Sequence, residues 1–260
     1  MNGYTMDYAE EARKRAEWIR ETVAEAGAKG VIFGNSGGKD SALVAILCKM
    51  AAQAAARDGG RLDVLGVMMP CGSKVNYGTD LEHAKALAQA FAIENITVDL
   101  TPARDALLRG IAEAAEVTQP ASANIHPRLR MTTLYAIAQS RGLLVAGTGN
   151  RSEIYTGYFT KWGDGGCDLN PIADVAAGEV PEFLRHLGAP AAIADKPPSA
   201  GLFEGQTDEA DMGVSYAAID RFIQTGEADA ADAAIISRMH RQTAHKRRMP
   251  KQYGYEGGNA

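Results

Sequence analysis

The sequence has few cysteines and no long hydrophobic run, and its first residues lack the apolar core that is typical of a signal peptide. Its 260 residues include only Cys48, Cys71 and Cys167, and none of them belongs to a C-x-x-C pair. This odd, widely spaced set argues against a disulfide framework and a zinc site, and indicates a reducing compartment. No apolar run approaches the roughly 18 residues needed to cross a bilayer. We therefore expect a cytoplasmic protein with no membrane association.

The sequence also lacks the basic excess that is typical of nucleic-acid-binding proteins. It has 27 Lys and Arg residues against 32 Asp and Glu residues, a net charge of −5, so we expect no nucleic-acid partner. Anionic small molecules stay compatible with this charge, because a pocket can be locally basic on an acidic protein. With no internal repeat and no low-complexity linker, the chain is expected to form one domain, residues 1–260.

Short apolar runs alternate with helical patterns over the first 150 residues. Strands are expected at 31–33, 62–69, 96–100 and 143–146, and helices at 7–26, 42–57, 80–91, 103–116 and 128–140. This alternation predicts an α/β fold with a doubly wound, mostly parallel sheet and helices on both faces. Because Pro127 disfavours helix at His126, we expect the last of these helices to begin near Arg128.

The pattern changes after residue 150. We expect a glycine-rich loop at 156–171, a helix at 179–187, an irregular loop at 195–213, helices at 214–224 and 228–242, and a basic segment at 245–251. Loops as long as 195–213 are usually functional or mobile in a compact domain.

A glycine-rich segment joins the first expected strand to the next helix. It consists of Gly34, Asn35, Ser36, Gly37, Gly38, Lys39, Asp40 and Ser41. Glycines let the backbone approach a ligand, and free N–H groups at a helix start attract anions. A Walker A loop is excluded because Phe33 occupies its first glycine position, and a dinucleotide fingerprint is excluded because Ser36 occupies its second. The pattern S-G-G-x-D-S resembles the pyrophosphate loop of ATP pyrophosphatases, which implies ATP as a co-substrate and a metal held by Asp40.

A second polar segment follows the fourth expected strand, from Gly147 to Glu153, and includes Thr148. Because ligands bind at the carboxyl ends of strands in open α/β sheets, we expect this segment on the same rim as the phosphate loop. Glu153 is then a candidate for a second carboxylate on the same Mg²⁺ ion.

Several further segments carry a resemblance to one family. They are 128–131 (RLRM), 157–171 (GYFTKWGDGGCDLNP), 196–202 (KPPSAGL), 205–209 (GQTDE) and 245–250 (HKRRMP). Together with the two polar segments they resemble the ammonia-dependent NAD synthetase family of the ATP pyrophosphatase superfamily. The resemblance implies a fold like the adenine nucleotide alpha hydrolases, and ATP-dependent amidation of deamido-NAD by ammonia. The carboxylate would form a deamido-NAD adenylate, and the products would be NAD, AMP and pyrophosphate.

The resemblance also implies roles for single residues. The segment from Gly34 to Ser41, with Thr148 and Ser199, would bind ATP, and Asp40 and Glu153 would bind Mg²⁺. The positions that would bind deamido-NAD are Arg128, Lys161, Asp168, His245 and Lys246. Asp40, Glu153 and Asp168 are the candidate catalytic residues, with Asp168 as the hypothetical acceptor of the proton from ammonium. A homodimer with the dinucleotide at the subunit interface is implied as well.

Alternatives remain from the sequence. Another amidating or adenylating enzyme of the ATP pyrophosphatase class is the nearest, but the chain shows neither a basic surface for tRNA nor room for a glutaminase domain, which favours free ammonia. A degenerate ATP-binding protein is the other. It is supported by Ala177, which stands where the family commonly has a lysine that contacts ATP, and opposed by both metal carboxylates.

Overall fold

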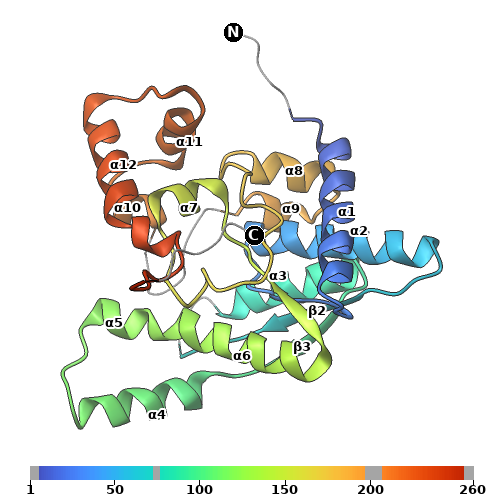
Figure 1. The fold of residues 1–260 in the computed structure, drawn as a ribbon, viewed down its shortest axis with the longest axis horizontal. Helices are drawn as coiled ribbons and strands as arrows, with labels where there is room; N and C mark the ends of the chain where they lie inside the picture. The colour runs from blue at the N-terminus through green and yellow to red at the C-terminus, as the bar shows by residue number, and fades with distance from the viewer. Residues whose placement is uncertain (1–5, 73–76, 197–206, 255–260) are drawn as a thin grey trace.

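Four parallel strands form the central sheet (Figure 1). The computed structural model describes residues 6–72, 77–196 and 207–254. The strands are β1 (Gly30–Gly34), β2 (Asp63–Met68), β3 (Glu94–Thr97) and β4 (Leu143–Ala146). Their order is β3-β2-β1-β4, so the chain runs outward from β1 and returns to its other side. The doubly wound α/β fold is therefore confirmed.

Helices fill the connections between the strands. Before β4 they are α1 (Tyr8–Glu25), α2 (Lys39–Arg57), α3 (Tyr77–Ala90), α4 (Thr101–Ala112), α5 (Gln119–Ala123) and α6 (Ile125–Arg141). After β4 they are α7 (Arg151–Thr156), α8 (Val180–His186), α9 (Ala191–Ala194), α10 (Asp208–Met212), α11 (Tyr216–Thr225), α12 (Ala230–Gln242) and the 3-10 turn η1 (Ala244–Lys246). No helix in the described ranges is long and apolar enough to cross a membrane.

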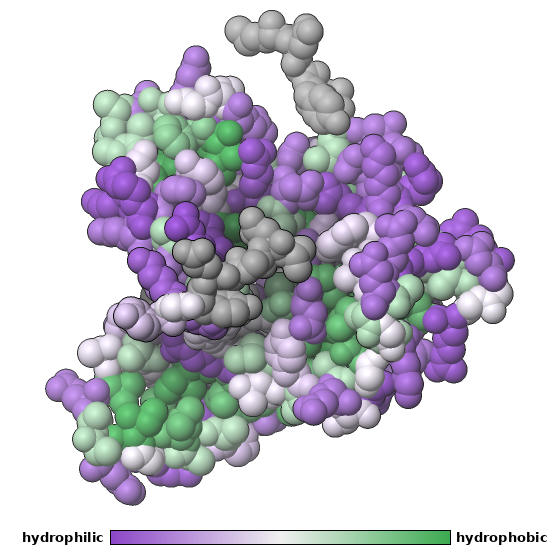
Figure 2. Space-filling view, in the orientation of Figure 1, coloured by the Kyte–Doolittle hydropathy of each residue, from purple (hydrophilic) through white to green (hydrophobic). Residues whose placement is uncertain are grey.

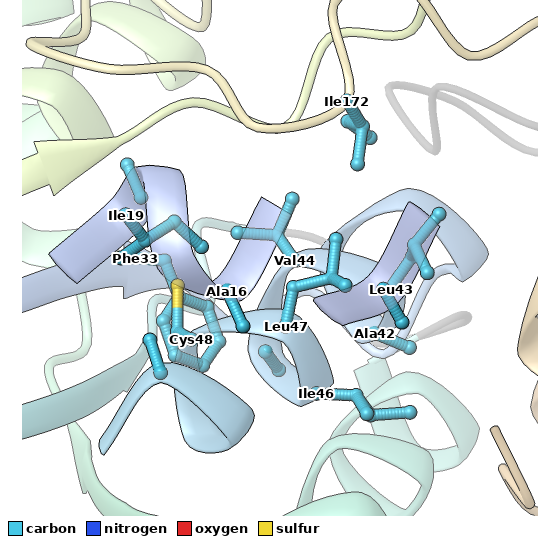
Figure 3. Packing of buried hydrophobic residues seen from close by; sticks show 14 of the residues in the cluster. Ala16, Ile19, Phe33, Ala42, Leu43, Val44, Ile46, Leu47, Cys48 and Ile172 are labelled. Atoms are coloured by element: carbon cyan, nitrogen blue, oxygen red, sulfur yellow. The ribbon is translucent and has the colours of Figure 1, made fainter. Parts of the chain in front are cut away.

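The larger core lies on the face of the sheet that α2 covers (Figure 3). Leu43 and Leu47 of α2 are fully buried with Phe33 of β1 and Ile19 of α1. α2 is apolar on most of its surface because the sheet contacts one side of it while α1 and α8 contact the others. Each such leucine stabilises the fold by about 1.5–3 kcal/mol, and this fixes the helix start that faces the pocket described below.

The opposite face of the sheet is covered by α6. Leu134 and Ala138 of α6 pack against Ile32 of β1 and Val145 of β4. Alternate residues of β1 therefore pack into the two cores on opposite faces of the sheet, as expected for a strand buried on both faces.

Several expectations about element bounds were wrong, among them the helix expected at 103–116, which is α4 at Thr101–Ala112. β3 spans 94–97 rather than 96–100, because the polar Glu94 and Asn95 pair with β2 at the edge of the sheet. α6 begins at Ile125 rather than near Arg128, because Pro127 lies in the first helical turn, where the missing N–H has no intrahelical partner to lose. Part of the expected loop 195–213 is the helix α10.

Helices α10, α11 and α12 form a lobe beside the sheet, drawn in orange and red in Figure 1. It has its own small core, which includes Met212, Tyr216, Ile219 and Ile236. The lobe contacts α7, where the His240 ring stacks on Tyr155 with 4.2 Å between centroids. It is thereby held against α7, the helix that follows β4.

Candidate active site

A pocket of about 1050 Å³ opens at the carboxyl edge of the sheet. The segments that follow β1, β2 and β4 line it, together with parts of α6, α10 and the glycine-rich loop after α7. The crevice between β1 and β4 is the point where the strand order reverses, which is where ligands bind in open α/β sheets.

The phosphate loop is held in shape by its own serines. The Ser36 hydroxyl accepts a hydrogen bond from the Gly38 N–H (3.2 Å) and lies 2.9 Å from the Ser41 hydroxyl. Gly37 has φ of +73°, and a Cβ atom there would lie 2.1 Å from the Asp80 carbonyl oxygen. Only glycine satisfies both conditions. The loop thus leads into α2 with the unpaired N–H groups of the helix start at the pocket.

Asn35 connects the phosphate loop to α3 and β3. Its side-chain amide donates to the Ala84 carbonyl of α3 and to Asn95 Oδ1 of β3, both at 3.0 Å, and the residue is buried. Its amide N–H groups tie the end of β1 to α3 and β3, and because Asn35 also lines the pocket, its expected contact with ATP stays a prediction.

Asn150 connects the two candidate metal ligands. Its side-chain amide donates to Asp40 Oδ1 (3.1 Å), and its backbone N–H donates to Glu153 Oε2 (2.9 Å). Its own Oδ1 accepts from the N–H groups of Ser152 and Glu153, which completes a capping box at the start of α7. The expected meeting of Asp40 and Glu153 on one rim is thus observed.

Both carboxyl groups are disfavoured as anions in the absence of a cation. Burial raises the pKa of Asp40, and burial together with the charge of Asp40 raises the pKa of Glu153 well above its usual range. Among the described residues no group of three or more His, Cys, Asp or Glu side chains forms a metal cluster. Two carboxylates beside a phosphate loop nevertheless fit Mg²⁺, which is usually held by one or two carboxylates, water and substrate phosphates.

Four of the residues expected to bind deamido-NAD lie together at the pocket rim. Arg128 donates to the Lys161 carbonyl (3.4 Å), and Lys161 Nζ donates to the His245 carbonyl (2.7 Å). Lys246 Nζ donates to the carbonyls of Gly157 (2.8 Å) and Phe159 (2.6 Å).

Within this group only Lys246 lines the pocket. Burial and the charges of Arg128 and Arg247 lower the pKa of Lys246, against the opposing charge of Asp164. The positive charges of Arg128 and Arg247 thus lie close to Lys246, and an anion bound at this rim would be attracted to them.

Asp168 occupies a different position. Its Oδ1 accepts from the Tyr135 hydroxyl (2.9 Å), and its Oδ2 accepts from the Val145 N–H of β4 (2.8 Å). The residue does not line the pocket. Its carboxylate thus binds the glycine-rich loop 156–171 to β4 of the sheet. A catalytic role for Asp168 stays a prediction.

The pocket gathers most of the remaining expected residues. Those that line it are Gly34, Asn35, Ser36, Gly38, Lys39, Asp40, Ser41, Thr148, Glu153 and Lys246. Ser199 lies outside the described residues.

Several residues of the pocket wall had been given no role from the sequence. Asp80, Lys196, Asp208 and Tyr216 all line it, and the Tyr216 hydroxyl donates to the buried Asp208 (3.2 Å). Lys196 and Asp208 belong to the segments 196–202 and 205–209 that carry the resemblance, but had been given no role; Asp80 and Tyr216 belong to no motif. Asn150 had a local signal, because N-x-x-E is a capping pattern.

The charge of the wall was also unexpected. In the described part of the chain, seven carboxylates but only four basic side chains, Lys39, Arg130, Lys196 and Lys246, line the pocket. The sequence had been compatible with a locally basic pocket; the described wall instead has more carboxylates than basic groups, so anionic ligands need a cation there.

A parallel sheet with an anion-binding glycine loop and paired carboxylates at its carboxyl edge defines a nucleotide-binding α/β protein. Comparison with known proteins is more specific. The chain matches the NAD synthase family over residues 11–250. It belongs to this family, as the sequence motifs had suggested.

Known relatives resemble the chain over nearly its full length. It is 45% identical over 248 residues to the NH(3)-dependent NAD(+) synthetase of Carboxydothermus hydrogenoformans, covering 95% of this chain and 98% of that protein. Among solved structures, it resembles the NMN synthetase of Francisella tularensis (TM-score 0.87, 33% identity, covering 96% and 100%). It also resembles the NAD+ synthetase of Burkholderia pseudomallei (TM-score 0.78, 30% identity, covering 95% and 92%).

Proposed function

We propose that the protein is a ligase that uses ATP and ammonia to amidate deamido-NAD, giving NAD, AMP and pyrophosphate. The observation that carries the proposal is the pocket in which the phosphate loop, Asp40 and Glu153 meet, in a chain that matches NH(3)-dependent NAD(+) synthetases over nearly its full length. The intact carboxylate pair argues against a degenerate ATP-binding protein.

The proposed reaction needs no nucleophile from the protein. The nicotinate carboxylate attacks the α-phosphate of ATP, which releases pyrophosphate and leaves an acyl adenylate. Ammonia then attacks the acyl carbon and AMP leaves. The chain contributes mainly by positioning two anions and neutralising charge: N–H groups at the start of α2 and Lys39 hold the leaving pyrophosphate, and Thr148 and Ser199 contact ATP.

Asp40 and Glu153 would hold Mg²⁺ together with phosphate oxygens of ATP. When bound, the ion neutralises charge that develops on the leaving pyrophosphate. Asn150 orients both carboxylates, since it donates to each of them. Their raised pKa values support this role, because a divalent cation would relieve the repulsion between them.

The basic rim would receive the phosphates of deamido-NAD. Arg128, Lys161, His245 and Lys246 are linked to one another or to the loop after α7 by hydrogen bonds through backbone carbonyls. Asp168 would contribute to the same substrate and accept the proton from ammonium. If an Asp168→Asn variant kept full turnover at neutral pH, that part of the proposal would fail.

We also propose a homodimer with the dinucleotide at its interface. No residue of α4 is buried, and Leu107 on this helix is 43% exposed. Figure 2 shows hydrophobic side chains gathered over α4 and α5. Light scattering should give twice the mass of the chain, and Leu107→Glu should shift it toward the monomer; an unchanged monomer for both would contradict the dimer.

The decisive experiment is a product analysis. Purified protein with ATP, Mg²⁺, ammonium and deamido-NAD should yield NAD, AMP and pyrophosphate, and Asp40→Asn should abolish them. Formation of ADP in place of AMP would contradict the proposed reaction. Glutamine in place of ammonium tests the nitrogen source.

Amidation of nicotinate mononucleotide is a second candidate. It is favoured by the similarity to the Francisella tularensis NMN synthetase, whose TM-score exceeds that of the Burkholderia pseudomallei NAD+ synthetase. Competing both acyl substrates in one reaction and comparing the two kcat/KM values separates the candidates.

A further inference from the structure

Lys196 lies in the pocket wall on the segment that follows α9. Its ammonium group forms an ion pair with Asp80 of α3, which is 116 positions away in the chain. The two side chains are 25% and 30% exposed, so both retain contact with solvent in the pocket. Lys196 opens the segment 196–202 that carries part of the family resemblance, but no role had been given to Lys196 or to Asp80 from the sequence.

Asp80 places this ammonium group beside the phosphate loop. The Asp80 carbonyl oxygen would lie 2.1 Å from a Cβ atom at Gly37, so the start of α3 and the loop are in direct contact. Gly38, Asp80 and Lys196 line the same pocket. Lys196 is thus brought next to the loop by tertiary packing alone.

The other basic side chains of the wall have different positions. Lys246 is bound to the carbonyls of Gly157 and Phe159, and Arg130 donates to the Met69 carbonyl. Lys39 belongs to the phosphate loop itself. Lys196 lies outside the loop and is paired with the carboxylate of Asp80, whose backbone packs against the loop at Gly37.

We propose that Lys196 binds the β- and γ-phosphates of ATP, exchanging Asp80 for phosphate oxygens when the nucleotide enters. A triphosphate carries more negative charge than a carboxylate, and an ammonium group has three donors on a flexible stem. In the free protein Asp80 keeps Lys196 at the loop and shields the cation. This assignment rests on the proposed use of ATP.

Calorimetry of nucleotide binding tests the assignment without requiring turnover. Lys196→Gln should weaken the binding of Mg²⁺-ATP and of pyrophosphate by about 10- to 100-fold, as expected for a lost hydrogen bond to a charged group. The binding of AMP should not change, because AMP lacks the phosphates that Lys196 would contact. If Lys196→Gln weakened the binding of ATP and of AMP by the same factor, the proposal would be overturned.

Asp80→Asn distinguishes phosphate binding from a purely structural ion pair. If Lys196 serves ATP, the asparagine removes a competitor and a repelling charge, and ATP should bind a few-fold more tightly. If the ion pair only holds α3 to the segment after α9, Asp80→Asn and Lys196→Gln should lower the affinity for ATP by the same factor. This result would refute the assignment.

Arg185→Gln is the matched control. It breaks the neighbouring ion pair between Arg185 and Asp195, which does not line the pocket, and should leave ATP binding unchanged. Urea unfolding of each variant shows whether it is folded.

Failure of the proposed function gives a different result. A wild-type protein that binds ATP but forms neither amidated product would refute that function, while the comparison of Lys196→Gln with Asp80→Asn would still decide the role of Lys196. A wild-type protein that binds no ATP would refute both.

Discussion

The amide of Asn150 donates a hydrogen bond of 3.1 Å to the carboxylate of Asp40, across 110 positions of the sequence. The same residue caps α7 and binds Glu153 through its backbone. One side chain therefore fixes the distance between the first turn of α2 and the first turn of α7. The two carboxylates are positioned by helix starts, which are rigid, rather than by loops.

Asn150→Ala and Asn150→Ser separate the cap from the contact to Asp40. Alanine removes both, and should lower the free energy of unfolding by about 1–2 kcal/mol as well as the amidation rate. Serine still caps α7 but does not reach Asp40, so stability should be largely kept while kcat falls about tenfold. Urea unfolding and steady-state kinetics measure the two effects. Wild-type kcat in both variants would show that the contact to Asp40 is dispensable.

Glu153→Gln removes a charge but keeps the capping box, since glutamine also accepts at that position. Because burial and Asp40 raise the pKa of Glu153, the uncharged variant should be at least as stable as the wild type without metal. The extra thermal stability that Mg²⁺ with ATP gives the wild type should be lost. Glu179→Gln is the control, because Glu179 likewise accepts a backbone N–H (2.9 Å, from Ala176) but lies outside the pocket. A full Mg²⁺ response in Glu153→Gln would exclude Glu153 as a ligand.

Ala177→Lys should strengthen ATP binding. Ala177 lines the pocket, and its N–H donates to the Ser152 hydroxyl (3.1 Å), so its side chain is fixed near α7. A cation on this acidic wall should lower the KM for ATP by several-fold. Ala177→Gln adds similar length without charge; if it lowers KM equally, charge is not the reason.

Because of His126, the free energy of unfolding of the ligand-free protein should be lower in mild acid than at neutral pH. Burial, with the charges of Arg130 and Arg104, lowers the pKa of His126 to about 4. Between pH of roughly 6.5 and 4 the unfolded chain takes up a proton at this residue that the folded chain refuses, so the free energy of unfolding falls as pH falls through this window. Urea unfolding at several pH values should show a shallower fall for His126→Asn.

Arg104→Met provides the complement to this test. This variant removes one of the two charges that repel protonated His126, so the pKa of His126 should move back toward its usual value. The loss of folding stability in mild acid should then be smaller. An unchanged pH profile in both variants would show that other groups cause the acid loss.

The sequence predicted those parts of the fold and site whose signals are local. The apolar run at 31–33 followed by S-G-G-x-D-S located β1, the phosphate loop and α2, because buried strands and anion loops have characteristic residues. The start of α6 was missed because the residue before a proline usually leaves the helical region, yet a helix start tolerates proline.

Other parts had no local signal. The approach of Lys196 to Asp80, and of Asp208 to the carboxylate pair, depends on how segments more than 50 residues apart pack. The acidic balance of the wall could not be read from the net charge for the same reason, since only tertiary structure decides which charges face a pocket.

Lys246 and Arg247 bind the carbonyl groups at the end of α7 and just after it, and Arg247 reaches those of Ile154 and Tyr155 at 3.3 and 3.1 Å. Because the N-cap of α7 is Asn150, which joins the two carboxylates, the site is rigid only when the polar groups at both ends of α7 have partners. During synthesis the strands and α2 leave the ribosome first, and the residues that close α7 leave almost 100 positions later. A growing chain therefore acquires its sheet early and its catalytic geometry late, so that nucleotide binding reports the completion of folding rather than its onset.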